Sequence, residues 1–179
     1  MTLEEQHLVK ECINGERKAQ KALYDMYSRQ MMSLCLRYTK DKETAHDLLQ
    51  EGFLLVFSNI DKFKGDGMLE AWIRKIFVNC ALDYLRKYDI LKETVDIDDD
   101  KISEMVDEST ISQISATELM DCIKSLPEGF RTVFNLYAVE GYSHKEIGEM
   151  HGISENTSRS QYMRARHKLR KMISEKGIY

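Results

Sequence analysis

Residues 143–171 read SHKEIGEMHGISENTSRSQYMRARHKLRK, and this stretch predicts two helices with a short break between them. Ser143, followed three residues later by Glu146, forms the capping-box pattern that marks the start of a helix. Gly152 can adopt the left-handed conformation that ends such a helix, and Ser154 is then a favourable N-cap for the next one. The spacing is that of a helix-turn-helix.

The second of these helices is strongly basic, although the whole chain carries a net charge of −4. Between Asn156 and Lys171 the sequence contains basic residues and no acidic one. A helix-turn-helix places its second helix in the major groove of DNA, with its cations along the phosphates. At 3.6 residues per turn, one face of this helix carries the residues that we expect to meet DNA: Asn156, Arg159, Ser160, Met163, Arg164 and His167.

A basic, solvent-facing helix whose cations suit the helix dipole is the alternative interpretation of this segment. Ser158 stands where helix-turn-helix sequences usually bury a branched apolar residue. On the side away from the expected DNA face lie four residues that we expect to pack on the first helix: Tyr162, Ala165, Leu169 and Ile173.

The rest of the chain also has the pattern of helices. Hydrophobic residues make up 42% of the sequence, which is enough for a folded core, and there is a single proline. No segment alternates apolar and polar residues with period two, so we predict an all-α fold. Helices are expected over residues 2–14, 17–38, 41–60 and 69–87 and, from residue 116 onward, over further segments broken at Pro127 and Gly141.

Charge is unevenly distributed along the chain. Residues 1–88 carry a net charge of +1, residues 89–118 carry −8 and residues 119–179 carry +3. Residues 89–115 also lose helical periodicity, and so acidic a stretch cannot bury enough apolar surface to order itself. We therefore predict two small helical domains, residues 1–88 and 116–179, joined by an acidic flexible linker.

Several functional classes find no support in the sequence. The four cysteines are far apart without metal-ligand spacing, so we expect buried small hydrophobes and no metal site. No residues assemble a nucleophile with a base or a pair of carboxylates, so we expect neither an enzyme nor a cofactor. The N-terminal residues form no signal region and no run reaches membrane-spanning length, so we expect a cytoplasmic, reduced protein without membrane insertion.

Two parts of the first domain carry residues suited to a partner. In residues 41–60, the side opposite the apolar stripe carries two carboxylates, one amide and one leucine: Asp47, Glu51, Gln50 and Leu54. Such a patch suits a docking surface, and an ordinary polar face with one exposed leucine is the alternative.

The loop at residues 61–68 combines two glycines, two lysines and an aromatic ring. Lys64 and Phe63 suit an unstacked nucleotide, the first for its backbone and the second for stacking, and a simple connecting turn is the alternative. The helix over residues 69–87 adds cations and an amide, and we interpret its Trp72 as a core anchor.

Taken together, three stretches resemble those of the extracytoplasmic-function sigma factors, a compact class of the sigma-70 family of bacterial promoter-recognition subunits. The stretches are DLLQEGF at residues 47–53, FKGDGMLEAWIRKI at residues 63–76 with Val78 and Asn79, and LPEGFR at residues 126–131 running on to RAR at residues 164–166. The resemblance covers most of the chain, and the order and spacing of the stretches make it specific.

The resemblance implies that residues 1–88 form sigma region 2, which docks on polymerase and recognises and melts the minus-ten element. It implies that residues 116–179 form region 4, which recognises the minus-thirty-five element. The upstream element would be bound by Asn156, Thr157, Arg159, Ser160, Met163, Arg164, Arg166 and Lys168. The melted element would be bound by Phe63, Lys64, Gly65, Asp66, Lys75 and Asn79, and the polymerase clamp helices by Asp47, Gln50, Glu51 and Leu54.

The partners implied are therefore core RNA polymerase, through the clamp helices and flap of its large subunits, promoter DNA and an anti-sigma factor. The function implied is that of a sigma factor that directs polymerase to promoters and assists their opening. A stand-alone helix-turn-helix regulator is the alternative, and it accounts for the C-terminal residues but not for the pattern at residues 63–79.

Overall fold

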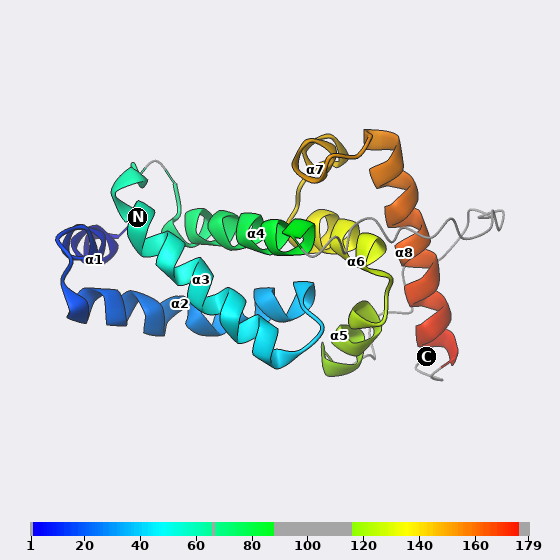
Figure 1. Cartoon of the computed structure of the whole chain (residues 1–179), viewed down its shortest axis with the longest axis horizontal. Coiled ribbons are helices and arrows are strands. Elements are labelled where there is room, and N and C mark those ends of the chain that lie inside the picture. Colours follow the sequence, from blue (N-terminus) through cyan, green and yellow to red (C-terminus); the bar gives the residue numbers. More distant parts are fainter. Residues whose placement is uncertain (1, 66, 88–115, 176–179) are drawn as a thin grey trace. The chain divides into compact units, whose positions relative to one another are not determined.

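The computed structural model describes residues 2–65, 67–87 and 116–175, which are helices and short connections without any strand among them (Figure 1). The predicted all-α fold is confirmed. The chain divides into two compact units, Met1–Tyr88 and Asp89–Tyr179. The predicted acidic linker at residues 89–115 lies outside the described residues, as does Asp66 of the expected nucleotide-binding loop.

The N-terminal unit consists of four α-helices and one short 3₁₀ turn. In chain order they are α1 (Leu3–Ile13), α2 (Arg17–Tyr38), α3 (Lys42–Asn59), the 3₁₀ turn η1 (Ile60–Lys62) and α4 (Leu69–Lys87). The predicted capping box of Thr2 and Glu5 opens α1, and Asp41 caps α3 by accepting a hydrogen bond from the amide of Thr44 at 2.8 Å. Local capping therefore sets where these helices begin.

Helices α2, α3 and α4 pack on one another, and α1 packs on α2. Helices α3 and α4 pack tightly at Gly52 in the middle of α3, where a Cβ atom would lie 2.3 Å from Cε1 of Phe77 on α4. Phe77 is fully buried and its ring meets that of Phe53 edge-on, with 5.3 Å between the centroids. The glycine is thus a packing requirement of the α3–α4 contact, which its poor helix propensity alone would not suggest.

The C-terminal unit contains α5 (Ala116–Lys124), α6 (Glu128–Phe134), the π-helix η3 (Asn135–Val139), α7 (His144–His151) and α8 (Glu155–Glu175). Helix α8 contacts α5, α6 and α7 (Figure 1). Pro127 stands at the N-cap of α6, as predicted, and Arg131 donates from Nη1 to the carbonyl oxygen of Lys124 at 3.1 Å. The buried guanidinium thereby satisfies one of the free carbonyls at the end of α5.

The apolar core of this unit lies against the C-terminal half of α8. Ala165 and Leu169 belong to one buried cluster with residues of α5, of α6 and of the connection between them: Cys122, Ile123, Leu126 and Phe130. The expectation that Ala165 and Leu169 pack on the first helix of the helix-turn-helix is therefore wrong. The periodicity identified the buried side of α8 correctly, but it could not identify which helix covers that side.

The four cysteines are buried and free of disulfides, as the sequence predicts. Burial raises the pKa of Cys35 to about 12 and that of Cys80 to about 12. Both thiols therefore stay protonated at neutral pH. None of the described helices is long and apolar enough to cross a membrane.

Candidate nucleic-acid interface

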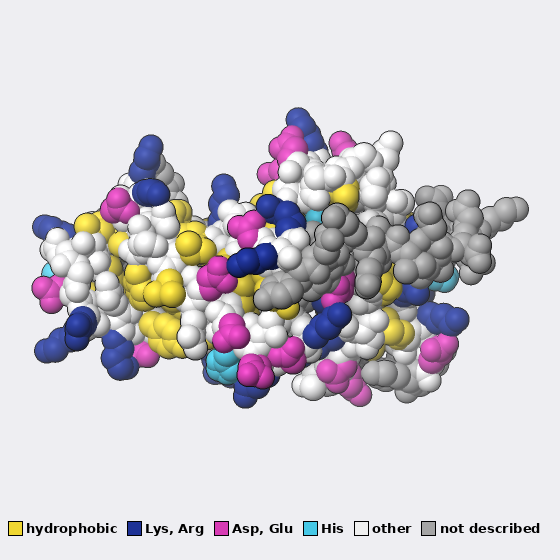
Figure 2. Space-filling view, in the orientation of Figure 1, with side chains coloured by type: hydrophobic (Ala, Val, Ile, Leu, Met, Phe, Trp, Pro, Cys, Tyr) yellow, Lys and Arg dark blue, Asp and Glu magenta, His cyan; other side chains and the backbone are white. Residues whose placement is uncertain are grey.

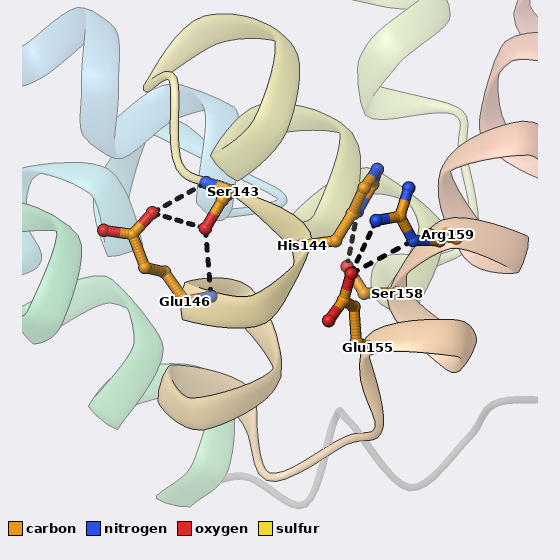
Figure 3. A network of polar contacts seen from close by, with 6 residues as sticks. All are labelled: Ser143, His144, Glu146, Glu155, Ser158 and Arg159. Atoms are coloured by element: carbon orange, nitrogen blue, oxygen red, sulfur yellow. Dashed lines mark hydrogen bonds and ion pairs between the residues drawn. The ribbon is translucent and has the colours of Figure 1, made fainter.

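Helices α7 and α8 with their connection form the predicted helix-turn-helix (Figure 3). The Ser143 amide donates to Oε2 of Glu146 at 2.8 Å, and the Glu146 amide donates back to Oγ of Ser143 at 3.3 Å. Gly152 ends α7 with a left-handed φ of 71°. The Thr157 amide donates to Oγ of Ser154 at 3.0 Å, so Ser154 caps α8 as predicted.

The residues expected to meet the upstream DNA element are accessible along α8. Asn156, Arg159, Ser160 and Arg166 are exposed, and the remaining four are partly exposed: Thr157, Met163, Arg164 and Lys168. Buried Ser158, Ala165 and Leu169 occupy other positions of the same helix. The basic side of α8 is therefore free to approach a DNA groove.

Arg159 is held by an acidic neighbour on its own helix (Figure 3). Its Nε and Nη2 atoms donate to Oε1 of Glu155 at 3.2 and 2.5 Å. Both side chains are about half exposed, so water screens the pair and a DNA base or phosphate can compete with Glu155 for the guanidinium. The free protein thus keeps this arginine extended over the first turn of α8.

Ser158 faces inward and is completely buried, which the sequence did not show. Its Oγ lies 2.9 Å from Nδ1 of His144 on α7, and this hydrogen bond joins the two helices of the motif (Figure 3). A polar pair thus stands where an apolar contact is usual. The departure at Ser158 was visible in the sequence, but its partner is 14 residues away, and nothing local identifies His144.

An aromatic cluster surrounds this pair. The ring of Tyr137, on η3, stacks on His144 with 4.2 Å between centroids and 9° between planes. Tyr162 of α8 approaches both rings, at 4.5 Å from Tyr137 and 5.7 Å from His144, and the Arg166 guanidinium lies 5.9 Å from the Tyr162 ring centroid. Tyr162 therefore packs against α7, as expected from its position.

The four residues of the expected docking surface are all exposed on α3: Asp47, Gln50, Glu51 and Leu54. Their spacing of three and four residues places them on one face of the helix. Leu54 is 69% exposed, and Leu55 beside it and Met26 of α2 are also exposed. Figure 2 shows hydrophobic side chains gathering on this part of the N-terminal unit beside acidic ones. An exposed apolar patch bordered by charge is typical of a protein interface.

The loop between η1 and α4 places its aromatic ring against the helix. Phe63 is half-buried, and its ring lies 5.5 Å from that of Trp72, with 48° between the planes. Gly65 takes a left-handed φ of 78°, and Lys64 is exposed. Trp72 is itself half-buried and packs against Phe63 outside the fully buried core, so its interpretation as a core anchor stays a prediction.

Lys75 and Asn79 are exposed on α4 and continue along the face that starts at Trp72, because the spacing is three and then four residues. At a rise of about 1.5 Å per residue, Asn79 lies roughly 10 Å along the axis from Trp72. The aromatic pair, the lysine and the amide therefore form a row. This row could contact several successive nucleotides of a single strand.

Two family models match these parts of the chain. Sigma-70 region 2 matches residues 23–89, which include α3, the loop and α4. Sigma-70 region 4 matches residues 116–169, which include α7 and most of α8. Together the two matches span most of the sequence, in the order that the resemblance implied.

Two curated relatives align over nearly the whole chain. The ECF RNA polymerase sigma factor SigM of Bacillus subtilis (strain 168) is 29% identical over 160 residues, covering 87% of this chain and 95% of the relative. The ECF RNA polymerase sigma-E factor of Escherichia coli (strain K12) is 29% identical over 175 residues, covering 92% of this chain and 91% of the relative.

Two solved structures share the fold. The sigma factor RpoE, from a complex with the anti-sigma factor NepR of Bartonella quintana, aligns with a TM-score of 0.55 and 17% identity, covering 86% of this chain and 96% of that one. CnrH, from a complex with the cytosolic domain of CnrY, aligns with a TM-score of 0.52 and 19% identity. The alignment covers 94% of this chain and 96% of CnrH. At such identities the likeness shows the fold alone.

Proposed function

Because this chain belongs to the extracytoplasmic-function group of the sigma-70 family of RNA polymerase sigma factors, we propose that its two units divide promoter recognition between them. A sigma factor directs core polymerase to promoters and acts in transcription initiation. The N-terminal unit takes the roles of region 2, and the C-terminal unit takes those of region 4. The protein acts by differential binding to DNA and polymerase, without a catalytic residue of its own.

Helix α8 reads the upstream element as duplex DNA. Arg159, Ser160 and Arg164 are accessible for base edges, and Arg166 and Lys168 lie further along the helix for phosphates. One bidentate contact from arginine to guanine contributes about 1–3 kcal/mol of discrimination. Asn156, Thr157 and Met163 complete the surface.

The N-terminal unit holds one strand of the opened downstream element. Unstacking and flipping a base costs about a few kcal/mol, and a fitted pocket recovers this only for the correct base. Phe63, Lys64 and Gly65 offer an aromatic edge, a cation and an open backbone, while Lys75 and Asn79 extend the row along α4. Asp66 belongs to the same proposed site.

The exposed face of α3 docks on the clamp helices of the polymerase largest subunit. Asp47 and Glu51 supply charge, Gln50 supplies hydrogen bonds and Leu54 supplies an apolar anchor. We also propose that the C-terminal unit meets the flap, that the protein works in the cytoplasm and that an anti-sigma factor restrains it. The Bartonella structure contains such a factor.

The observation that carries this proposal is that separate matches to regions 2 and 4 coincide with two separate accessible surfaces. The test is run-off transcription by purified core polymerase over a library of random promoters. With this protein added, we expect transcripts from templates that share two short sequence blocks at one fixed separation. A stable dimer that binds palindromic duplex without polymerase would instead support the stand-alone regulator.

A further inference from the structure

The C-terminal unit buries polar as well as apolar side chains. The apolar cluster covers the C-terminal half of α8, from Ala165 onward. Outside this cluster, Val133, Leu136 and Ile147 are completely buried, and six polar or charged residues are buried as well: Arg131, Thr132, Asn135, His144, Ser158 and Gln161. Ser158 and Gln161 lie on the first two turns of α8, so polar contacts take part in fixing that end of the helix.

Among these contacts, the hydrogen bond of 2.9 Å between His144 and Ser158 joins α7 directly to α8. Ser158 is fully buried and His144 is 8% exposed, so water does not replace either partner readily. Ser158 lies between Thr157 and Arg159, and Ser160 follows. A rotation or slide of α8 at Ser158 would move each of these DNA-facing residues.

We propose that His144 and Ser158 are positioning residues that fix the rotation of α8 on α7 and thereby set selectivity for the upstream element. This inference rests on the proposed function, because it assumes that α8 reads DNA. An apolar pair holds two helices together without a preferred direction, whereas a hydrogen bond requires a short distance and a narrow angle. A reading surface displaced by about 1 Å loses its contacts.

The surroundings of His144 favour the neutral imidazole. From η3, Tyr137 stacks on the ring. From α8, Tyr162 approaches it, and Arg159 and Glu155 act on its charge. Burial lowers the pKa of His144 below its ordinary value, Arg159 lowers it further, and Glu155 opposes both.

The lowered pKa of His144 determines how the stability of the folded protein changes with pH. The unfolded chain binds the proton more readily, so the contribution of neutral His144 is complete above its ordinary pKa, about 6.5. It is lost as the pH falls through the lower pKa of the folded state. The thermal midpoint should therefore fall on acidification below about pH 6.5, whereas the hydrogen bond itself can persist, because protonated Nδ1 can donate to Oγ of Ser158.

The test uses the full chain with core polymerase and three variants: His144→Phe, Ser158→Val and the double variant. Phenylalanine keeps a ring to stack on Tyr137 but has no nitrogen, and valine restores the usual apolar residue. The readout is the ratio of transcription from a promoter with an intact upstream element to that from one with the element scrambled.

We expect each single variant to lower this ratio at least about fivefold, because each leaves one buried polar group without its partner. The thermal midpoint should fall in both single variants and recover in the double one. Below pH 6.5 the thermal midpoint should decline more steeply for the wild type than for the double variant, which has no imidazole at this position. His7→Phe, at an exposed histidine of α1, is the matched control and should behave as wild type.

Single variants that keep the wild-type ratio while folded would overturn the inference and leave the proposed function intact. A double variant whose thermal midpoint follows the wild-type pH profile would overturn the account of neutral His144. A wild-type protein that stimulates transcription without any preference for an upstream element would overturn the proposed function, and the inference with it.

Discussion

If α8 reads DNA as proposed, single side chains on this helix determine whether binding is selective or merely electrostatic. Arg164 is partly exposed on the proposed reading face, whereas Arg170 is exposed one to two turns further along. We expect Arg164→Ala to reduce transcription about 5–150-fold from promoters with the preferred base at one upstream position, which corresponds to ~1–3 kcal/mol. Arg170→Ala is the control and should affect all sequences alike. An equal loss across all promoters with Arg164→Ala would contradict direct readout.

Glu155 restrains Arg159 in the free protein, so its removal should release a cation at the DNA-facing end of α8. We expect Glu155→Gln to tighten binding of random duplex and to steepen its dependence on salt, measured by fluorescence anisotropy. The free energy of unfolding should change by less than about 1 kcal/mol, because the pair is half exposed. Glu175→Gln, at the other end of α8, makes the same charge change and should leave binding unaltered.

At this scale the sequence predicted which side chains of α8 face outward. The helical period of 3.6 residues places Arg159 and Ser160 on one side of the helix and Ala165 and Leu169 on another. It did not predict the contact of Ser158 with His144. Such a contact depends on how two helices are rotated relative to each other, and that is settled by tertiary packing and not by local pattern.

Helix boundaries followed from short-range chemistry. The side chains of Thr2, Asp41, Ser143 and Ser154 accept amide hydrogen bonds at the predicted starts of their helices. The π-helix η3 was not foreseen, because its wider turn has no sequence signature as clear as a cap. The role of Gly52 was also hidden, since a glycine within a helical pattern gives no sign of what lies against it.

Gly52 should be intolerant of a side chain. We expect Gly52→Ala to lower the free energy of unfolding by about 1–3 kcal/mol, because the new Cβ would meet the fully buried ring of Phe77 at 2.3 Å. Thermal or urea unfolding of the full chain measures this. Gly67→Ala is the matched control, since its Cβ would meet nothing within 4 Å. A stabilised Gly52→Ala protein would show that helix propensity outweighs the close contact.

The α3 face should govern affinity for polymerase. We expect Asp47→Ala combined with Glu51→Ala to weaken binding to core polymerase about fivefold or more, or ~1 kcal/mol, because both carboxylates are exposed at the proposed interface. Titration of labelled protein with core polymerase measures this. Glu16→Ala combined with Asp25→Ala removes the same charge elsewhere and should bind normally. Equal affinities for both double variants would remove the docking assignment.

At the scale of the whole molecule, the proposal is that the protein divides two kinds of DNA recognition between two helical units. The uneven charge of the sequence, with −8 in residues 89–118 between segments of +1 and +3, indicated this division. Residues 1–88 and 119–179 are each only weakly basic, so duplex binding by the free protein should be poor, and polymerase should supply most of the electrostatic affinity. The same reasoning disfavours a regulator that grips intact DNA alone.

The most direct test of this division is to select promoters from one random library with core polymerase and three proteins: wild type, Arg164→Ala and Asn79→Ala. We predict that wild type selects two sequence blocks at a fixed separation, that Arg164→Ala relaxes only the upstream block and that Asn79→Ala relaxes only the downstream one. Without polymerase, none of the three should enrich any sequence. If both variants relaxed the same block, or if the protein alone enriched duplex sites, the division of recognition between the two units would be contradicted.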